Sequence, residues 1–222
     1  MGEIDWFPVG LTVQVASLAT VLAVVLGIPL GWLLARRSFP GSRLLGAVIL
    51  LPIILPPTVL GYYLLQLIGR RTVVGRFLED SLGITIVFTW RAAVLAAAIV
   101  ALPLVVRSAQ AAFEGIDPTL EAAARTLGRS EPAIFFTITL PLAWRGILAG
   151  TVLGFARAMG EFGATLMVAG NIPGRTQTLP IAIYDAVQAG NNDLANTLVV
   201  LLSLIAIVFL LILGRLAWIG RW

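Results

Sequence analysis

The chain has 222 residues, of which 59% are hydrophobic and only 12% charged, and its mean hydropathy is +0.99. Soluble domains carry about 25% charged residues, so this composition predicts an integral membrane protein. Aromatic residues scattered through the apolar runs argue against a nucleic-acid surface. The net charge is +4 with every positive side chain an Arg, and the lack of Cys and His excludes disulfides, thiolate or histidine metal sites, and catalysis by a Cys nucleophile or a His base.

Five apolar runs reach the length of about 20 residues that crosses a bilayer. The polar segments between them are too short for an independent core, so we expect one all-α transmembrane domain over residues 1–222 with about five spans. The first run is too long for a cleaved signal peptide and lacks a basic front end. The runs cover residues 9–35, 44–68, 84–106, 142–165 and 195–218.

Arginine placement predicts how these spans are oriented. With the N-terminus outside, eight arginines fall in cytoplasmic segments and four in outer segments, which favours an outer N-terminus and a cytoplasmic C-terminus. The cytoplasmic set is Arg36, Arg37, Arg43, Arg107, Arg125, Arg129, Arg215 and Arg221, and the outer set is Arg70, Arg71, Arg76 and Arg175.

The second apolar run is interrupted by Pro52 and by the pair Pro56 and Pro57. Proline removes a backbone donor and kinks a helix, and free carbonyls at membrane depth are tolerated only against protein or beside a water-filled path. Two interpretations remain open. The run is either a kinked packing helix or a bend that lines a translocation path, with Pro56 and Pro57 as path residues.

The longest polar segment lies between the third and fourth runs and predicts two short helices. Asp117 is suited to cap the first helix, Pro118 to its first turn, and Glu121 lies near the positive end of the helix dipole. Gly128 is a natural left-handed stop, and residues 130–132, Ser-Glu-Pro, begin a second helix at once.

The fourth run carries a face with almost no side chain. Gly146, Gly150, Gly154 and Ala158 repeat every four residues, which is the spacing of a small-residue packing ridge. The ridge fits either a helix pair within one subunit or the closure between two subunits.

Arg157 and Glu161 end the same run and lie four residues apart, so a helix places them on one face. Charges within a span are costly and usually face the protein interior. The pair is either a self-neutralising structural contact, or a gate at which Arg157 offers a passing anion a transient counter-charge. After it, residues 179–190 predict a short amphipathic helix on the outer face.

The polar segment resembles a known motif. Ala123-Ala124, then Gly128, then Ile138 and Leu140-Pro141 are similar in spacing to the cytoplasmic EAA loop of ABC importer permeases. The family's Glu directly precedes the Ala pair, whereas this chain has Ala122 there. The resemblance implies that residues of about 107–141 form a coupling loop that docks on an ATPase subunit. The candidate coupling residues are Glu121, Ala123, Ala124, Gly128, Leu140 and Pro141.

The similarity covers nearly the whole chain. The stretch from Arg157 to Pro180, together with residues 39–41 and 51–57, resembles the oxyanion branch of these permeases, and the molybdate permeases most. The resemblance implies a type I ABC importer permease in a prokaryotic inner membrane that moves molybdate, driven by ATP hydrolysis in a partner. Tungstate and sulfate are the alternative substrates.

The expected assembly follows from these points. Five spans cannot easily enclose a path, so we expect a homodimer with the path at its twofold axis, surrounded by lipid. The chain has no phosphate-binding loop of the Gly-x4-Gly-Lys type, so we expect no catalysis and no cofactor in this chain, with ATP and Mg on two ATP-binding subunits. An extracytoplasmic oxyanion-binding protein completes the predicted partners.

Two other functions are weaker alternatives. A secondary transporter driven by an ion gradient would show inverted repeats and intramembrane carboxylates, but the span count is odd and Glu161 is the one acidic residue within a predicted span. A membrane-embedded hydrolase would need a nucleophile and base at a recognisable spacing, which the sequence does not show.

Overall fold

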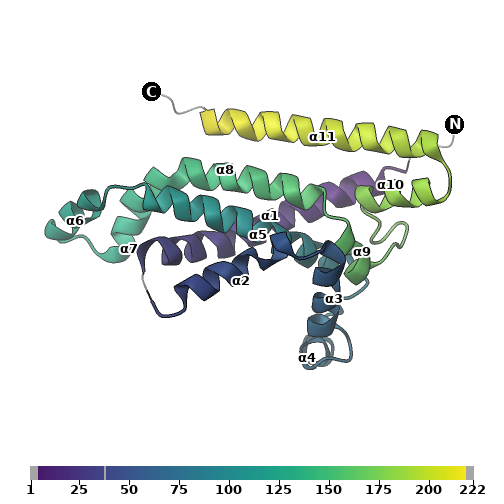
Figure 1. The fold of residues 1–222 in the computed structure, drawn as a ribbon, viewed down its shortest axis with the longest axis horizontal. Coiled ribbons are helices and arrows are strands. Elements are labelled where there is room, and N and C mark those ends of the chain that lie inside the picture. Colours follow the sequence, from purple (N-terminus) through teal and green to yellow (C-terminus); the bar gives the residue numbers. More distant parts are fainter. Residues whose placement is uncertain (1–4, 38, 219–222) are drawn as a thin grey trace.

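The computed structural model describes residues 5–37 and 39–218, and the secondary structure in this part of the chain is helical (Figure 1). The helices are α1 (Phe7–Arg36), α2 (Ser42–Ile54), α3 (Pro57–Ile68), α4 (Val73–Leu82), α5 (Trp90–Glu114), α6 (Pro118–Thr126), α7 (Glu131–Ile134), the π-helical turn η1 (Phe135–Thr139), α8 (Leu140–Met159), α9 (Gly163–Ala169), α10 (Leu179–Gln188) and α11 (Asn192–Trp218).

The core of the molecule is the bundle of α1, α5 and α8, with α5 the most buried span. Small side chains allow these helices to approach closely. A Cβ on Gly27 would lie 2.8 Å from Cγ1 of Val105, and a Cβ on Gly31 would lie 2.8 Å from Cβ of Ala109. The first half of α5 is rich in alanine, and five of these alanines are fully buried: Ala92, Ala93, Ala96, Ala97 and Ala101.

Within residues 5–37 and 39–218, four helical segments are long and apolar enough to cross a membrane: α1, α5, the continuous segment Glu131–Met159, and α11 over Asn192–Ile212. The second apolar run is not a straight span, because α2 and α3 meet at a bend of 117°. In Figure 1, α3 stands away from the bundle and carries α4 at its far end. The all-α fold class is confirmed.

Helix α4 was not predicted. Thr72 caps it, since its Oγ1 accepts from the N–H of Gly75 at 3.0 Å, and Gly83 ends it in the left-handed region at φ 63°. The sequence between the second and third runs predicts a polar connection. In the structure, Val73 and Phe77 lie one helical turn apart on α4, and both side chains are exposed.

The third run is displaced along the chain: the helix is α5, residues 90–114, and not 84–106. It begins late because Phe88 has φ 60° and its N–H donates to the carbonyl of Val168 at 2.9 Å, which holds the preceding residues outside a helix. It continues into the polar segment because Arg107, Gln110 and Glu114 hydrogen-bond one another at helical spacing.

The fourth run also has different bounds. It begins at Glu131, because α7, η1 and α8 join without a break, and it ends at Met159 instead of residue 165. Glu161 leaves the helix and accepts a hydrogen bond from the N–H of Ala164 at 2.9 Å, which starts α9. The short helix predicted over 179–190 is confirmed as α10, and its Leu179 N–H donates to Oγ1 of Thr12 on α1 at 2.7 Å.

Candidate functional site

The candidate coupling segment folds as a helical elbow at one end of the bundle (Figure 1). Oδ1 of Asp117 accepts from the N–H of Thr119 at 2.9 Å, and this hydrogen bond lowers the pKa of the Asp117 carboxyl. Gly128 has φ 78°, and the N–H of Arg129 closes the end of α6 on the carbonyl of Ala124 at 3.1 Å. A left-handed residue after α6 therefore turns the chain directly into α7, as the sequence predicted.

Glu121 is the centre of this elbow and lies almost fully buried, with 9% of its side chain exposed. Its Oε1 accepts from Nη2 of Arg36, the last residue of α1, at 2.9 Å and from Oγ1 of Thr139 in η1 at 2.9 Å. Its Oε2 lies 3.6 Å from Nη2 of Arg125. One carboxylate therefore joins the end of α1, the coupling helix α6 and the entry to α8.

A cavity of about 440 Å³ opens beside this carboxylate, between the end of α1 and the elbow. Arg125 lies on its rim and also pairs with Glu131, through Nη2 and Oε2 at 3.0 Å. The hydrogen bond to Glu131 raises the pKa of Arg125, so its guanidinium stays charged. The lining residues are Trp32, Arg36, Arg37, Glu121, Arg125, Glu131, Ile134, Phe135 and Thr139.

An aromatic cluster supports the elbow from beneath. The ring of Phe135 meets Trp32 edge to face at 5.8 Å between centroids and lies 6.2 Å from the fully buried Phe113. Leu140 packs against this cluster, whereas Pro141 is exposed at the start of α8. In α6, Ala124 faces inward and Ala123 is exposed.

The elbow also presents apolar side chains outward. Leu127 is 83% exposed and Leu120 is 46% exposed. An exposed apolar surface on a polar loop is typical of a protein interface. The elbow is thus fixed to the bundle by its buried carboxylate and open on its outer side.

The glycine ridge of α8 packs against α5 of the same chain. A Cβ on Gly146 would lie 2.5 Å from Cβ of Ala112, one on Gly150 would lie 2.5 Å from Cβ of Ser108, and one on Gly154 would lie 3.1 Å from Cγ2 of Val105. Of the two interpretations, this geometry favours the helix pair within one subunit.

The candidate path residues lie towards the other end of α8. Nη2 of Arg157 lies 3.0 Å from Oε2 of Glu161, with 36% of the Arg and 1% of the Glu side chain exposed. Pro56 and Pro57 occupy the exposed corner between α2 and α3. A Cβ on Gly163 would lie 2.8 Å from Cβ of Pro57, so the start of α9 packs on that corner. The structure therefore brings the proline corner close to the segment that follows Glu161.

The sequence did not predict the two residues that hold Glu121 in place, Arg36 and Thr139. Arg36 was read as a positive flank, and nothing in the local sequence links it to a carboxylate 85 positions away. Among residues 5–37 and 39–218, no three acidic side chains gather as metal ligands. Arg221, which was counted among the flanking arginines, lies outside the described residues.

Comparison of the sequence with known protein families identifies the family of this chain. The sequence matches the family described as "Binding-protein-dependent transport system inner membrane component" over residues 27–219. The chain belongs to this family. Its members are multi-pass permease subunits of importers, which work with an ATPase and a substrate-binding protein.

Individual relatives match over nearly the whole of this chain. The chain is 49% identical to the molybdenum transport system permease protein ModB of Escherichia coli K12 over 218 residues, which is 98% of this chain and 95% of that protein. It is 44% identical to ModB of Haemophilus influenzae, covering 96% and 92% of the two chains. It is 42% identical to ModB of Mycobacterium tuberculosis, covering 95% and 79%.

Solved structures show the same fold. A chain of the MetNI methionine ABC transporter, in a study of its inward-facing conformations, superposes with a TM-score of 0.74 at 21% identity and covers 98% of each chain. A chain of a bacterial ABC transporter for the acidic polysaccharide alginate gives a TM-score of 0.72 at 16% identity, covering 100% and 82%. The fold is that of the type I ABC importer permeases, as predicted.

Proposed function

We propose that this chain is the transmembrane subunit of an ABC importer that carries molybdate across the inner membrane. The observation that carries the proposal is the similarity of nearly the whole chain to molybdenum permeases of three bacterial genera, at 49%, 44% and 42% identity. Tungstate and sulfate are tetrahedral oxyanions of the same charge and remain the alternative substrates. The chain acts without a cofactor or catalytic group of its own, and ATP with Mg belongs to the partner ATPase.

The proposed assembly is a homodimer with two ATP-binding subunits and an extracytoplasmic oxyanion-binding protein. The spans α1, α5 and α8 pack directly on one another, and the broken segment α2–α3 exposes apolar residues such as Ile54 and Leu67. A second copy across a twofold axis would cover part of this apolar surface and complete the path. The elbow would face the cytoplasm, with the N-terminus outside and the C-terminus inside.

Coupling would pass through the elbow. Leu120 and Leu127 supply an apolar contact surface for the ATP-binding subunit, while Glu121 fixes α6 to the end of α1 and to η1. Because the Glu121 carboxylate is buried and bonded to Arg36 and Thr139, a force on α6 would also move α1 and the segment from η1 into α8. Gly128 closes the elbow tightly enough for α6 to act as a rigid lever.

The path residues suit transit rather than retention. Glu161 neutralises Arg157, so the pair gives a passing dianion only weak attraction, and an anion held strongly would not leave. Selectivity would then lie mainly in the binding protein, with the Arg157 pair and the proline corner acting as gates.

The test is ATP hydrolysis by the chain reconstituted with its ATP-binding subunit while binding protein loaded with molybdate, tungstate or sulfate is titrated in. Stimulation by the molybdate-loaded form supports the proposal. Stimulation by the tungstate-loaded or sulfate-loaded form alone would identify that oxyanion as the substrate instead. Uptake driven by an ion gradient without any ATPase partner would instead favour a secondary transporter.

A further inference from the structure

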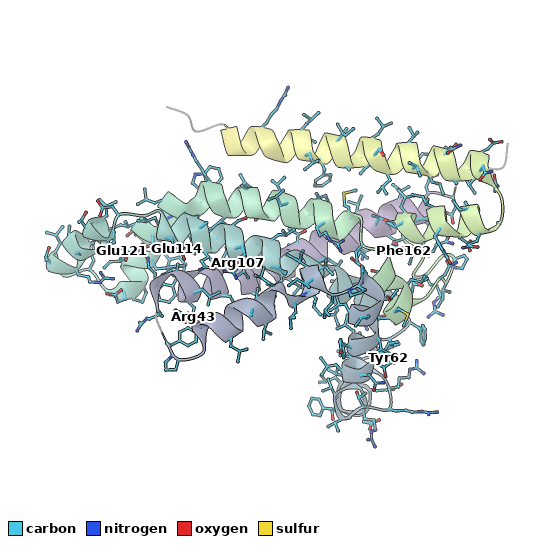
Figure 2. All side chains as sticks on the ribbon, viewed as in Figure 1. Arg43, Tyr62, Arg107, Glu114, Glu121 and Phe162 are labelled. Atoms are coloured by element: carbon cyan, nitrogen blue, oxygen red, sulfur yellow. The ribbon has the colours of Figure 1, made fainter. Side chains whose placement is uncertain are left out.

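A second charged cleft lies between α2 and α5, at the end of the bundle that carries the elbow. It has a volume of about 340 Å³ and does not share a residue with the cavity beside Glu121. Figure 2 labels both arginines of the cleft, Arg43 at the start of α2 and Arg107 on α5. The lining residues are Leu34, Ser42, Arg43, Gly46, Arg107 and Gln110.

Arg107 is held in place across the seam between the two helices. Its Nη1 donates to Oε1 of Gln110 at 2.9 Å, and its Nη2 lies 3.4 Å from the carbonyl oxygen of Gly46 on α2. Nε2 of Gln110 in turn donates to Oε1 of Glu114 at 2.8 Å, which turns the amide carbonyl towards Arg107. The guanidinium is therefore pre-oriented by neutral acceptors and keeps further N–H donors free.

The residues that line the cleft carry positive charge and include no carboxylate. The carboxylate of Glu114 is separated from Arg107 by the amide of Gln110. Ion pairs within 4.0 Å join Arg36, Arg125 and Arg157 to carboxylates, but none in the described part of the chain involves Arg43 or Arg107. Two guanidinium groups that line one cleft without a carboxylate repel each other. An anion placed between them would remove this repulsion and satisfy their free donors.

We propose that this cleft binds a tetrahedral oxyanion between Arg43 and Arg107. Planar guanidinium forks match the paired oxygens of such an ion, which a single flexible ammonium would not. The same chemistry has two sources, the transported oxyanion at the end of its passage and the phosphate of a membrane phospholipid. The assignment to the transported oxyanion rests on the proposed function, whereas the binding of an oxyanion by the cleft does not.

The competing interpretation is that these arginines only supply the positive charge that commonly flanks membrane spans. Any arginine at this end of the bundle would then be equivalent to them. Arg145 provides the comparison, because it is an exposed arginine near the start of α8, at the elbow end of the bundle, and does not line the cleft. Replacing Arg145 removes the same charge without touching the cleft.

The experiment uses the full chain purified in a neutral, phosphate-free detergent. Equilibrium dialysis against molybdate, with the bound metal quantified, measures the transported source. Native mass spectrometry of chain exposed to phosphatidylglycerol and then washed measures the lipid source. Both are run on the unaltered chain and on Arg43→Gln, Arg107→Gln and Arg145→Gln.

We expect one oxyanion or one phospholipid bound per chain, with affinity lowered about tenfold or more by Arg43→Gln and by Arg107→Gln but unchanged by Arg145→Gln. Saturable molybdate binding assigns the site to the transported ion, and retained lipid without molybdate binding assigns it to a headgroup. Equal retention by all four proteins, or no binding of either probe, would overturn the proposal.

A milder variant protects the test against loss of folding. Gln110→Leu keeps both arginines but removes the acceptor that orients Arg107, so we expect it to elute as the unaltered chain does and to bind about threefold more weakly. Unchanged affinity in that variant would contradict a pre-oriented site. Because binding is measured without ATP or the binding protein, its outcome is independent of whether loaded binding protein stimulates ATP hydrolysis.

Discussion

Arg36, the last residue of α1, donates from Nη2 to Oε1 of Glu121 on α6 across 2.9 Å, although 85 positions separate the two residues in the chain. The same oxygen accepts from Thr139, where the chain enters the span α8. The first span, the elbow and the fourth apolar run are thereby joined at one atom. In the proposed assembly, this junction connects the elbow that would contact the ATP-binding subunit with the helices of the bundle.

Replacing Glu121 with Ala should loosen the elbow and uncouple the transporter. Arg36 would lose its partner in a site where 17% of its side chain is exposed, which costs about 1–3 kcal/mol. We expect ATP hydrolysis to continue while transport per ATP falls, measured by ATPase rate and uptake in the same proteoliposomes. Glu131→Gln is the control, because Glu131 is 64% exposed and water screens its ion pair with Arg125. Equal losses in both variants would contradict the central role of Glu121.

Gly128→Val should also uncouple hydrolysis from transport. Gly128 has φ 78°, and a residue with a Cβ costs about 1–2 kcal/mol in that region, more when it is β-branched. Gly115→Ala is the comparison, since Gly115 ends α5 at φ −75°, which any residue adopts. Uptake and hydrolysis at the normal ratio in Gly128→Val would show that the elbow does not need its tight turn.

Substitutions on the glycine ridge should rank by the distance to α5. The Cβ of Gly150→Ala would lie 2.5 Å from Cβ of Ser108, whereas that of Gly154→Ala would lie 3.1 Å from a Val105 methyl. Overpacking costs about 1–3 kcal/mol, so we expect Gly150→Ala to lower the melting temperature in detergent more than Gly154→Ala, and Gly150→Leu to disrupt assembly. Gly10→Ala meets open space and should change nothing. A reversed order would exclude close packing of α8 on α5.

The two partners of the Arg157–Glu161 pair should respond unequally. Arg157→Gln leaves a carboxylate with 1% of its side chain exposed unpaired, which is strongly destabilising, whereas Glu161→Gln leaves an Arg that is 36% exposed and reaches water. We therefore expect the larger loss of thermal stability in Arg157→Gln. Transport assays on protein that remains folded then separate a gate from a structural pair, since a structural pair changes stability alone.

The cap of α6 should depend on pH. The hydrogen bond from Thr119 holds the pKa of Asp117 below its usual value of 3.8, so this cap stabilises α6 fully above that value and is lost as pH falls through the lower folded pKa. Amide-exchange protection factors of α6 should decrease in that acidic window. Asp117→Asn accepts the same hydrogen bond without a titrating charge, and its protection should not change there.

Local chemistry in the sequence was sufficient for much of the coupling segment. Asp117, Pro118 and Gly128 each act within a few residues, through a cap, a first turn and a left-handed stop, and the structure has all three. The partners of Glu121 were not predictable in this way. Arg36 and Thr139 reach it only because the packing of α1 on α5 and α8 sets their positions, and no short-range pattern carries that information.

Hydrophobicity located the spans but not their ends. The side-chain hydrogen bonds among Arg107, Gln110 and Glu114 extend α5 through a stretch that reads as polar, and the carboxylate of Glu161 ends the fourth run early by accepting from the N–H of Ala164. Prolines indicated a break in the second run, but they gave neither its 117° angle nor the separate helix α4.

The bend between α2 and α3 bears on how the protein is made. These helices have 13 and 12 residues, so at about 1.5 Å per residue each is about 20 Å long, shorter than the roughly 30 Å hydrocarbon layer. During synthesis this segment offers the insertion machinery no continuous apolar rod. The surfaces that receive it, on α5 and α9, are both translated later. Biogenesis therefore has a built-in order, in which the broken segment takes its final position only after the spans behind it have emerged.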